Sequence, residues 1–253
     1  MKNIFFKERK KDGKNKNNLI SLFYAILAAI LIRSFCFEPF SIPSGSMYPN
    51  LKVGDYLFVS KYKYGFSKHS LPFSVPLIPG RLFYSEPKRG EIVVFKTPED
   101  NRTDYIKRVI GLPGDTVEMR KNILYINEEK VKTFKLNKEK YKNFDVSRIK
   151  EILPNKNSYE VYEFNKMLLG LNTNDFKKIK IPENRFFVLG DNRDNSQDSR
   201  FIGLIPRDNL VGRAEIVFVS FDTDIGSFLK FWTWFPALRK DRLIVSLLPI
   251  EEE

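Results

Sequence analysis

A serine and a lysine that could form a catalytic pair lie in two separate motifs of this chain. Ser46 lies in segment 42–49, which is rich in Pro, Ser and Gly, and Lys107 lies in segment 105–115. A third segment, 190–200, is dense in Asp, Asn, Ser and Arg. A serine hydroxyl is a weak nucleophile until a base removes its proton. The pattern therefore predicts a hydrolase in which a lysine is the base and a serine is the nucleophile.

Lysine can serve as that base only if its pKa falls from about 10.4 towards neutrality, and burial has this effect. Alternate residues of a strand share one face. In a strand, Lys107 would share its face with Tyr105 and Val109. We therefore expect the amine to have apolar neighbours that disfavour its charged form.

The residues around Ser46 suit a nucleophile that must be held rigidly. Pro43 and Pro49 stiffen the segment, and Gly45 would let a substrate backbone approach closely. The hydroxyl of Ser44 and the backbone N–H of Ser46 could both face a developing oxyanion. The segment therefore predicts a nucleophile together with its oxyanion hole.

Other reactive groups give weaker alternatives. His69 is the only histidine, and it lies in a polar loop without a neighbouring carboxylate, which disfavours a serine–histidine triad. Cys36 is the only cysteine, so no internal disulfide can form, and it borders an apolar run among aromatic residues. Segment 60–63 matches the S-x-x-K pattern of penicillin-binding enzymes, but neither S-D-N nor K-T-G occurs in the chain.

The composition also argues against a metal centre. One histidine and one cysteine are too few for a typical zinc site. The acidic segment 191–198 does not match the calcium-hand pattern, because its required Gly falls on Ser199 and its final Glu on Ile205. We expect the enzyme to use neither a metal ion nor a cofactor.

The positive charge of the chain is concentrated in two places. The net charge is +12, of which residues 1–18 contribute +5 (seven Lys/Arg against two Asp/Glu) and residues 121–183 another +5 (fourteen against nine). A uniformly basic nucleic-acid surface is therefore not expected. A basic tail fits anionic lipid better, at roughly 1 kcal/mol per charge near the surface.

An apolar run over residues 19–37 predicts a membrane anchor. It is interrupted mainly by Arg33, whose side chain could reach the interface, and it is long enough to span a bilayer. A cleaved export signal would need small residues after the apolar core, which are missing here; a buried core helix is the other alternative. The basic residues 1–18 should stay in the cytoplasm, which places everything after Phe37 on the opposite side.

The rest of the chain predicts a mainly β body of one domain with an insertion. Short apolar runs between turn signals predict strands at 56–59, 91–95, 105–110, 123–126, 185–189 and 214–221. Residues 61–88 resemble a long loop, and residues 127–183 an inserted subdomain of weak apolar pattern. The catalytic body would then comprise 38–126 and 184–253. Within it, segment 228–238 holds both tryptophans and could contact lipid or form a core strand and turn.

Taken together, the motifs resemble those of bacterial type I signal peptidase, the membrane-bound serine endopeptidase that removes signal peptides from exported proteins. The resemblance is carried by segments 38–49, 54–55, 89–95, 107–115 and 190–200, in the order found in that family. It covers about half of the chain and does not extend to residues 127–183. It implies a β-rich catalytic body with a smaller insertion, behind one N-terminal transmembrane helix.

The resemblance also implies a role for individual residues. Ser46 matches the nucleophile that forms the acyl-enzyme, Lys107 the general base, and Ser44 the oxyanion-hole hydroxyl. Ser196 matches the residue that orients the lysine. Asp198 and Arg200 match residues that brace the site. Ile42 and Ile106 match residues that line the shallow pockets for small side chains at −1 and −3 of the cleavage site. A regular strand would place Ile106 and Lys107 on opposite faces, so a bulge or an edge position is required.

The implied partners are exported precursor proteins and membrane lipid, but not nucleic acid, and we expect a monomer. The implied location is the bacterial inner membrane, with one span, a cytoplasmic N-terminus and the catalytic body outside. Two alternatives stay open. Self-cleaving repressors share the Ser/Lys chemistry but would carry a DNA-binding domain, and a membrane-tethered basic scaffold would have no activity at all.

Overall fold

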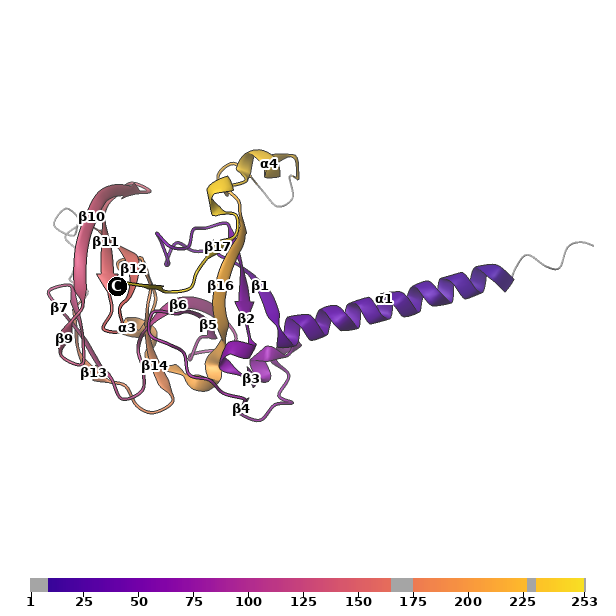
Figure 1. Ribbon diagram of the computed structural model, residues 1–253, viewed down its shortest axis with the longest axis horizontal. Coiled ribbons are helices and arrows are strands. Elements are labelled where there is room, and N and C mark those ends of the chain that lie inside the picture. Colours follow the sequence, from indigo (N-terminus) through magenta and orange to yellow (C-terminus); the bar gives the residue numbers. More distant parts are fainter. Residues whose placement is uncertain (1–8, 165–174, 227–230, 253) are drawn as a thin grey trace, which may run out of the picture.

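A long helix projects from a β-rich body (Figure 1). The structure is a computed structural model that describes residues 9–164, 175–226 and 231–252. Strands outnumber helices throughout the body, which is mainly β, as the sequence predicts. The described helices after the first are short: α3 (Ser199–Ile202), α4 (Trp234–Ala237) and a few 3-10 turns.

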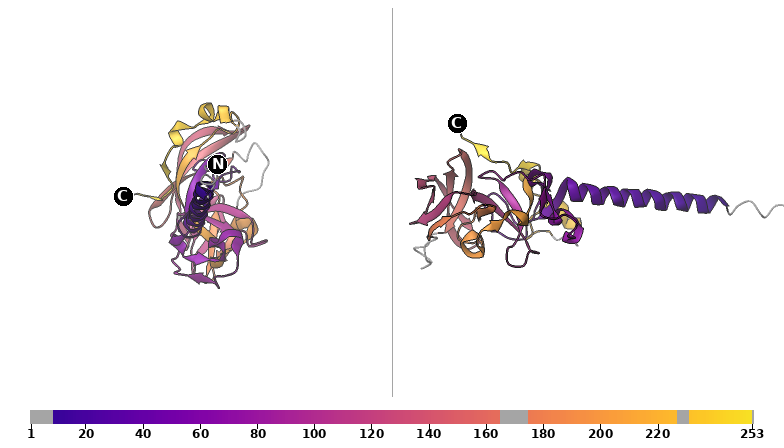
Figure 2. Two further views of the ribbon diagram at one scale, coloured as in Figure 1. Left: turned by 90° about the vertical axis from the view of Figure 1, so that its right-hand side faces the viewer. Right: turned by 90° about the horizontal axis from the view of Figure 1, so that it is seen from below.

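The projecting helix, α1, spans Arg9–Phe35. Its stretch Asn18–Phe35 is long and apolar enough to cross a membrane, and its large apolar side chains are exposed. Figure 2 shows that the helix stands clear of the body when it is seen from below. The alternative of a buried core helix is therefore wrong. The helix ends earlier than the predicted run does, because Phe37 already pairs with Ser60 in a sheet.

The main sheet curls and carries the predicted strands of the body. Its strands follow one another in the order β1 (Phe37–Ser41), β2 (Asp55–Ser60), β16 (Leu210–Ser220), β5 (Ile92–Lys96), β6 (Asp104–Gly111), β14 (Arg185–Leu189) and β15 (Ile205–Pro206), with β17 (Val245–Ser246) beside β16. The strand predictions at 56–59, 91–95, 105–110, 185–189 and 214–221 are confirmed. All of these pairs are antiparallel.

The first half of strand β6 has a neighbouring strand on one side only. Strand β5 pairs with it from Asp104 to Arg108. On the other side, β14 pairs with Arg108, Val109 and Gly111. Among the described residues, no strand covers that side of residues 104–107, so this part of β6 is an open edge of the sheet.

Residues 127–183 contribute to two further sheets. One contains β10 (Lys132–Tyr141), β11 (Phe144–Ile152), β12 (Asn157–Phe164) and β18 (Ile250–Glu251); the other contains β13 (Phe176–Lys180), β7 (Thr116–Arg120), β8 (Ile123–Ile126) and β9 (Glu129–Lys130). The strand prediction at 123–126 is confirmed. Residues 61–88 are mostly loop, with the small pair β3 (Phe66–Ser67) and β4 (Arg81–Leu82). The predicted division at 38–126, 127–183 and 184–253 stays a prediction.

A hydrophobic cluster supports the segment that carries Ser46. Ile42, Met47 and Leu51 are buried in it together with residues of β2 and β16. Burying a side chain of this size contributes about 1.5–3 kcal/mol. Because Ile42 and Met47 lie on either side of Ser46, the cluster fixes the segment at both ends.

The C-terminal segment crosses from the main sheet to the sheet of residues 127–183. Strand β17 lies beside β16, and Leu247 then enters the cluster that also contains Ile42 and Met47. Strand β18 pairs with Asn157 and Ser158 of β12. The last described residues therefore tie the two sheets together.

The aromatic segment 228–238 is described from Phe231 onwards, and its first three residues lie outside the described part of the chain. It forms a 3-10 turn, Phe231–Thr233, followed by α4. Trp232 is 64% exposed and Phe235 is 77% exposed. The interpretation as a core strand and turn is therefore wrong for the described part. Contact with lipid stays a prediction.

Candidate active site

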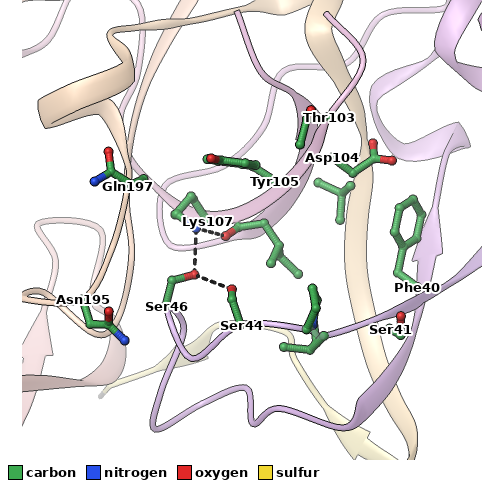
Figure 3. A pocket seen from close by; sticks show the side chains of 14 residues that line it. Phe40, Ser41, Ser44, Ser46, Thr103, Asp104, Tyr105, Lys107, Asn195 and Gln197 are labelled. Atoms are coloured by element: carbon green, nitrogen blue, oxygen red, sulfur yellow. Dashed lines mark hydrogen bonds between the residues drawn. The ribbon is translucent and has the colours of Figure 1, made fainter. Parts of the chain in front are cut away.

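The side chains of Ser46 and Lys107 meet at the open edge of β6 (Figure 3). Lys107 Nζ donates to Ser46 Oγ at 2.9 Å and to the Ile106 carbonyl at 2.8 Å. Ser44 Oγ lies 3.4 Å from Ser46 Oγ. Ser46 and Lys107 are both buried, whereas Ser44 is exposed. The amine is thus within reach of a proton on the Ser46 hydroxyl.

Burial controls the charge of the Lys107 amine. Desolvation lowers the pKa of Lys107 from 10.5 to about 8, and the negative charges of Asp198 and Asp191 oppose this shift in part. The ring of Tyr105 lies 5.3 Å from the Nζ atom, on the strand face that the sequence predicts. About half of the Lys107 amines are therefore neutral at pH 8, and a neutral amine can accept a proton.

The backbone around Ser46 is held from one side by Asn192. The Asn192 backbone N–H donates to the Ser46 carbonyl, and its side-chain amide donates to the Gly45 carbonyl, each at 3.0 Å. Asn192 is completely buried. These two bonds fix the orientation of both peptide groups beside the hydroxyl of Ser46.

Asp198 and Arg200 hold together the polar segment that supplies Asn192. The Asp198 carboxylate accepts from the Gly190 N–H at 2.9 Å and from two guanidinium nitrogens of Arg200 at 2.8 Å each. Arg200 also donates to the Arg193 carbonyl at 2.7 Å. Asp198 is fully buried. The contacts join the two ends of segment 190–200 into one rigid loop.

Ser196 is buried beside the nucleophile segment. Within the described part of the chain, its Oγ has no hydrogen-bond partner. Ser196 and Ser46 both pack against Gly190. A Cβ added to Gly190 would lie 2.1 Å from Ser196 Oγ and 2.6 Å from the Ser46 carbonyl oxygen. The role of Ser196 in orienting the lysine stays a prediction.

Ile42 and Ile106 line a cleft of about 470 Å³ that also contains Ser44, Ser46 and Lys107. Ile106 and Lys107 can both border this cleft because their part of β6 is an open sheet edge. The required edge position is therefore present.

Asn195 and Gln197 are cleft residues that the sequence analysis missed. Both are exposed and line the cleft on either side of the buried Ser196 (Figure 3). Their place in the polar segment 190–200, next to a candidate site residue, was the only signal that could have identified them.

The alternative nucleophile and base pairs lack the necessary contacts. His69 Nδ1 lies 3.1 Å from Ser74 Oγ, and no carboxylate of the described residues is bonded to it. Burial, together with nearby cationic side chains, lowers the pKa of His69 to about 4. Lys63 Nζ lies over the ring of Tyr62, while Ser60 Oγ is bonded to Glu215, so segment 60–63 contains no serine–lysine contact.

A family model and full-length relatives identify the family of this chain. The family model described as signal peptidase, peptidase S26, matches residues 16–219. Signal peptidase I of Rickettsia typhi is 37% identical over 94% of this chain and 96% of its own length, and that of Rickettsia felis is 37% identical over 92% and 93%. A solved signal peptidase I from Enterococcus faecalis is 28% identical over 51% of this chain and 97% of that chain, with a TM-score of 0.31.

Proposed function

Because this chain belongs to the signal peptidase family, peptidase S26, and is a serine endopeptidase that removes signal peptides, we propose that Ser46 and Lys107 perform the cleavage. The observation that carries the proposal is the 2.9 Å contact between the buried Lys107 amine and the Ser46 hydroxyl. A base within hydrogen-bond distance of the nucleophile is the arrangement that acyl transfer requires.

The reaction proceeds in two halves. The neutral amine of Lys107 takes the hydroxyl proton while Ser46 Oγ attacks the scissile carbonyl carbon. The Ser44 hydroxyl and the Ser46 N–H stabilise the resulting oxyanion. The ammonium of Lys107 then protonates the leaving amine, and an ester between Ser46 and the signal peptide remains. Water, deprotonated by Lys107, hydrolyses this ester and returns Ser46 to its starting state.

The precursor binds as an extended segment along the open edge of β6, where no strand of the described residues covers one side of residues 104–107. Small side chains at −1 and −3 enter the shallow pockets bordered by Ile42 and Ile106. Larger side chains clash there, which makes the pocket selective. Ser196, Asp198 and Arg200 support this site by orienting Lys107 and bracing the loop behind it.

The enzyme works at the surface of a bacterial inner membrane. Helix α1 anchors it, the basic residues 1–18 stay in the cytoplasm, and the catalytic body lies outside. The exposed aromatic residues of Phe231–Thr233 and α4 give a second contact with lipid. The anchor concentrates enzyme and membrane-held precursor in one layer. The protein acts as a monomer and binds no nucleic acid.

Incubation of the full-length enzyme, in detergent micelles, with a precursor that carries alanine at −1 and −3 tests this proposal. We expect a mature product whose new N-terminus is residue +1. After acid quenching, mass spectrometry should find the Ser46 peptide esterified by the C-terminus of the signal peptide. Cleavage with the ester on any other residue, or no cleavage at all, would contradict the proposal.

Enlarging the pocket should relax specificity. In an Ile42→Ala/Ile106→Ala variant, precursors with leucine at −3 should gain about tenfold in kcat/KM relative to those with alanine, because one methylene group in an apolar pocket is worth roughly 10–200-fold in discrimination. Competition between the two precursors in one tube measures the ratio. Leu77→Ala, at an exposed site that does not border the cleft, is the matched control. An unchanged ratio would remove these isoleucines from the pocket.

A further inference from the structure

Gly45 separates the two serines of the site, and its missing side chain leaves room for Tyr141. The φ angle of Gly45 lies outside the left-handed region, so its backbone conformation does not require glycine. An added Cβ would lie 2.0 Å from the Tyr141 hydroxyl oxygen and 3.1 Å from its ring carbon Cζ. The interpretation that Gly45 makes room for a substrate backbone is therefore replaced: the space is already filled by Tyr141.

Tyr141 is itself held firmly in place. It is the last residue of β10 and is buried at the tip of the β10–β11 hairpin. Its ring lies 4.9 Å from that of Tyr48, 6.2 Å from that of Tyr162 and 6.1 Å from that of Phe164. Asn195, at the rim of the cleft, donates to its hydroxyl at 3.4 Å.

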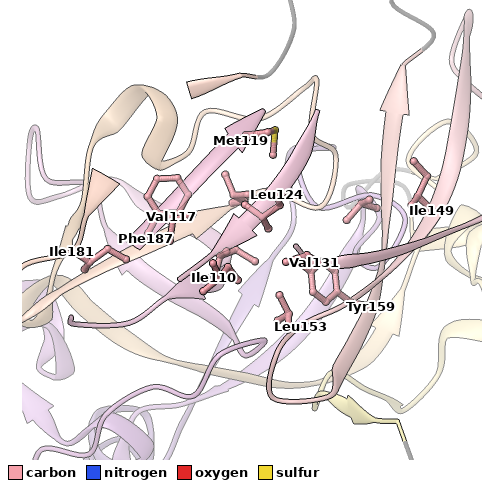
Figure 4. Packing of buried hydrophobic residues seen from close by; sticks show 13 residues of the cluster. Ile110, Val117, Met119, Leu124, Val131, Ile149, Leu153, Tyr159, Ile181 and Phe187 are labelled. Carbon is pink, nitrogen blue, oxygen red and sulfur yellow. The ribbon is translucent and has the colours of Figure 1, made fainter. Parts of the chain in front are cut away.

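The hairpin cannot shift easily relative to the catalytic body. Side chains of β11 and β12, such as Ile149 and Tyr159, share one buried cluster with Ile110 and Phe187 of the body (Figure 4). The backbone of Tyr162 also exchanges two hydrogen bonds with segment 191–193, donating at 2.9 Å and accepting at 3.0 Å. The position of the Tyr141 ring is thus fixed relative to Gly45.

We propose that Tyr141 is a positioning residue for the nucleophile segment, an inference that rests on the proposed function. Asn192 holds the carbonyls of Gly45 and Ser46, and Tyr141 fills the space next to the Gly45 Cα. Together they fix the Gly45 peptide, and with it the hydroxyl of Ser46 relative to the amine of Lys107. Residues 127–183 therefore support catalysis in addition to contributing strands to two sheets.

A pair of compensating substitutions tests this contact. Gly45→Ala should lower kcat about 100-fold, with KM changed less than about threefold, because a displacement near 1 Å in an active site has effects of this size. Tyr141→Phe alone removes only the oxygen and should lower kcat less than about fivefold. The Gly45→Ala/Tyr141→Phe double variant lacks the Tyr141 hydroxyl oxygen, which would lie 2.0 Å from the added Cβ. Its kcat should therefore be at least about tenfold higher than that of Gly45→Ala.

The proposal is overturned if the double variant is no faster than Gly45→Ala, or if Gly45→Ala keeps full activity. Should Gly45→Ala fail to fold, Tyr141→Ala serves instead: its kcat should fall about tenfold at unchanged KM, and full kcat would overturn the proposal. Phe134→Ala, on the same strand but 53% exposed, should leave kcat unchanged.

Failure of this inference differs from failure of the proposed function. If wild type cleaves the precursor and Ser46→Ala does not, the proposed function holds, and a double variant without recovery rejects the Tyr141 contact alone. If Ser46→Ala still cleaves, the proposed function itself is rejected.

Discussion

Replacement of Lys107 by methionine is expected to lower kcat/KM for precursor cleavage by roughly four orders of magnitude, and Ser46→Ala should do the same. The amine is the basic group in contact with the Ser46 hydroxyl, at 2.9 Å, so its loss leaves the nucleophile protonated. Since the two groups act as a unit, the double variant should be no slower than either single variant. Initial rates of precursor cleavage measure all three.

The pH profile gives the same prediction a second readout. The pKa of Lys107 is lowered to about 8 by burial, so the fraction of neutral amine increases as the pH rises through that value. Wild-type kcat/KM should therefore reach half of its maximum near pH 8 and level off roughly one to two pH units higher. The residual rate of Lys107→Met should not show this step. A midpoint near that of an ordinary histidine, or full activity in Lys107→Met, would contradict the Ser46–Lys107 pair.

Loss of folding does not explain the expected loss of activity in Lys107→Met. The folded pKa of Lys107, about 8, lies below its unfolded value of 10.5, so the folded state binds fewer protons between these pH values and wild-type stability rises with pH across that window. Below pH 8 the buried charge destabilises wild type by its full amount, on the order of 3 kcal/mol. At pH 7 the methionine variant should unfold at a temperature no lower than wild type.

Glu151→Ala is expected to have the largest effect on stability, a loss of about 3–5 kcal/mol in the free energy of unfolding. The Glu151 carboxylate accepts from Arg193 Nη1 at 2.7 Å, and both side chains are almost completely buried. The Tyr159 hydroxyl donates to the same carboxylate at 2.7 Å. Removing the Glu151 carboxylate leaves the buried Arg193 cation without the acid that it is bonded to, and the buried Tyr159 hydroxyl without its acceptor.

Urea unfolding measures this loss. Glu128→Ala is the matched control, because Glu128 also pairs with a cation, Lys178, but at an exposed site where screening leaves no measurable effect. A change below about 1 kcal/mol for Glu151→Ala would show that the buried pair contributes no more than a surface pair. Since Arg193 follows Asn192 in the chain, the variant should also lose activity before it unfolds completely.

The sequence predicts strands well where one face is buried and apolar residues recur. Strands β5 and β14 are almost continuous apolar runs, and both form where the sequence predicts them. Strand β10 was not predicted because its residues 132–138 are exposed on both faces and only Phe134 and Leu136 alternate with polar residues, which is too short a pattern to indicate a strand. Its lysines instead keep an open sheet edge from pairing with another chain.

The residues of the candidate site also fall into two groups, those that the sequence predicts and those that only the fold brings together. Ser46, Lys107 and Ser44 stand in recognisable motifs, and the local strand pattern is enough to suggest that Lys107 is buried. Tyr141 has no such motif, because its contact with Gly45 joins residues far apart in the sequence. The unbonded hydroxyl of Ser196 also could not be predicted, since it depends on side-chain positions within a buried loop.

The crossing of the C-terminal segment couples the nucleophile to residues that are very distant in the sequence. Leu247 is buried in the cluster that supports Ile42 and Met47, and Glu252 hydrogen-bonds through its backbone N–H to the Lys156 carbonyl. Contacts between residues so far apart form only after the chain between them has been brought together. The packing under Ser46 is therefore complete only after this distant segment has docked on both sheets.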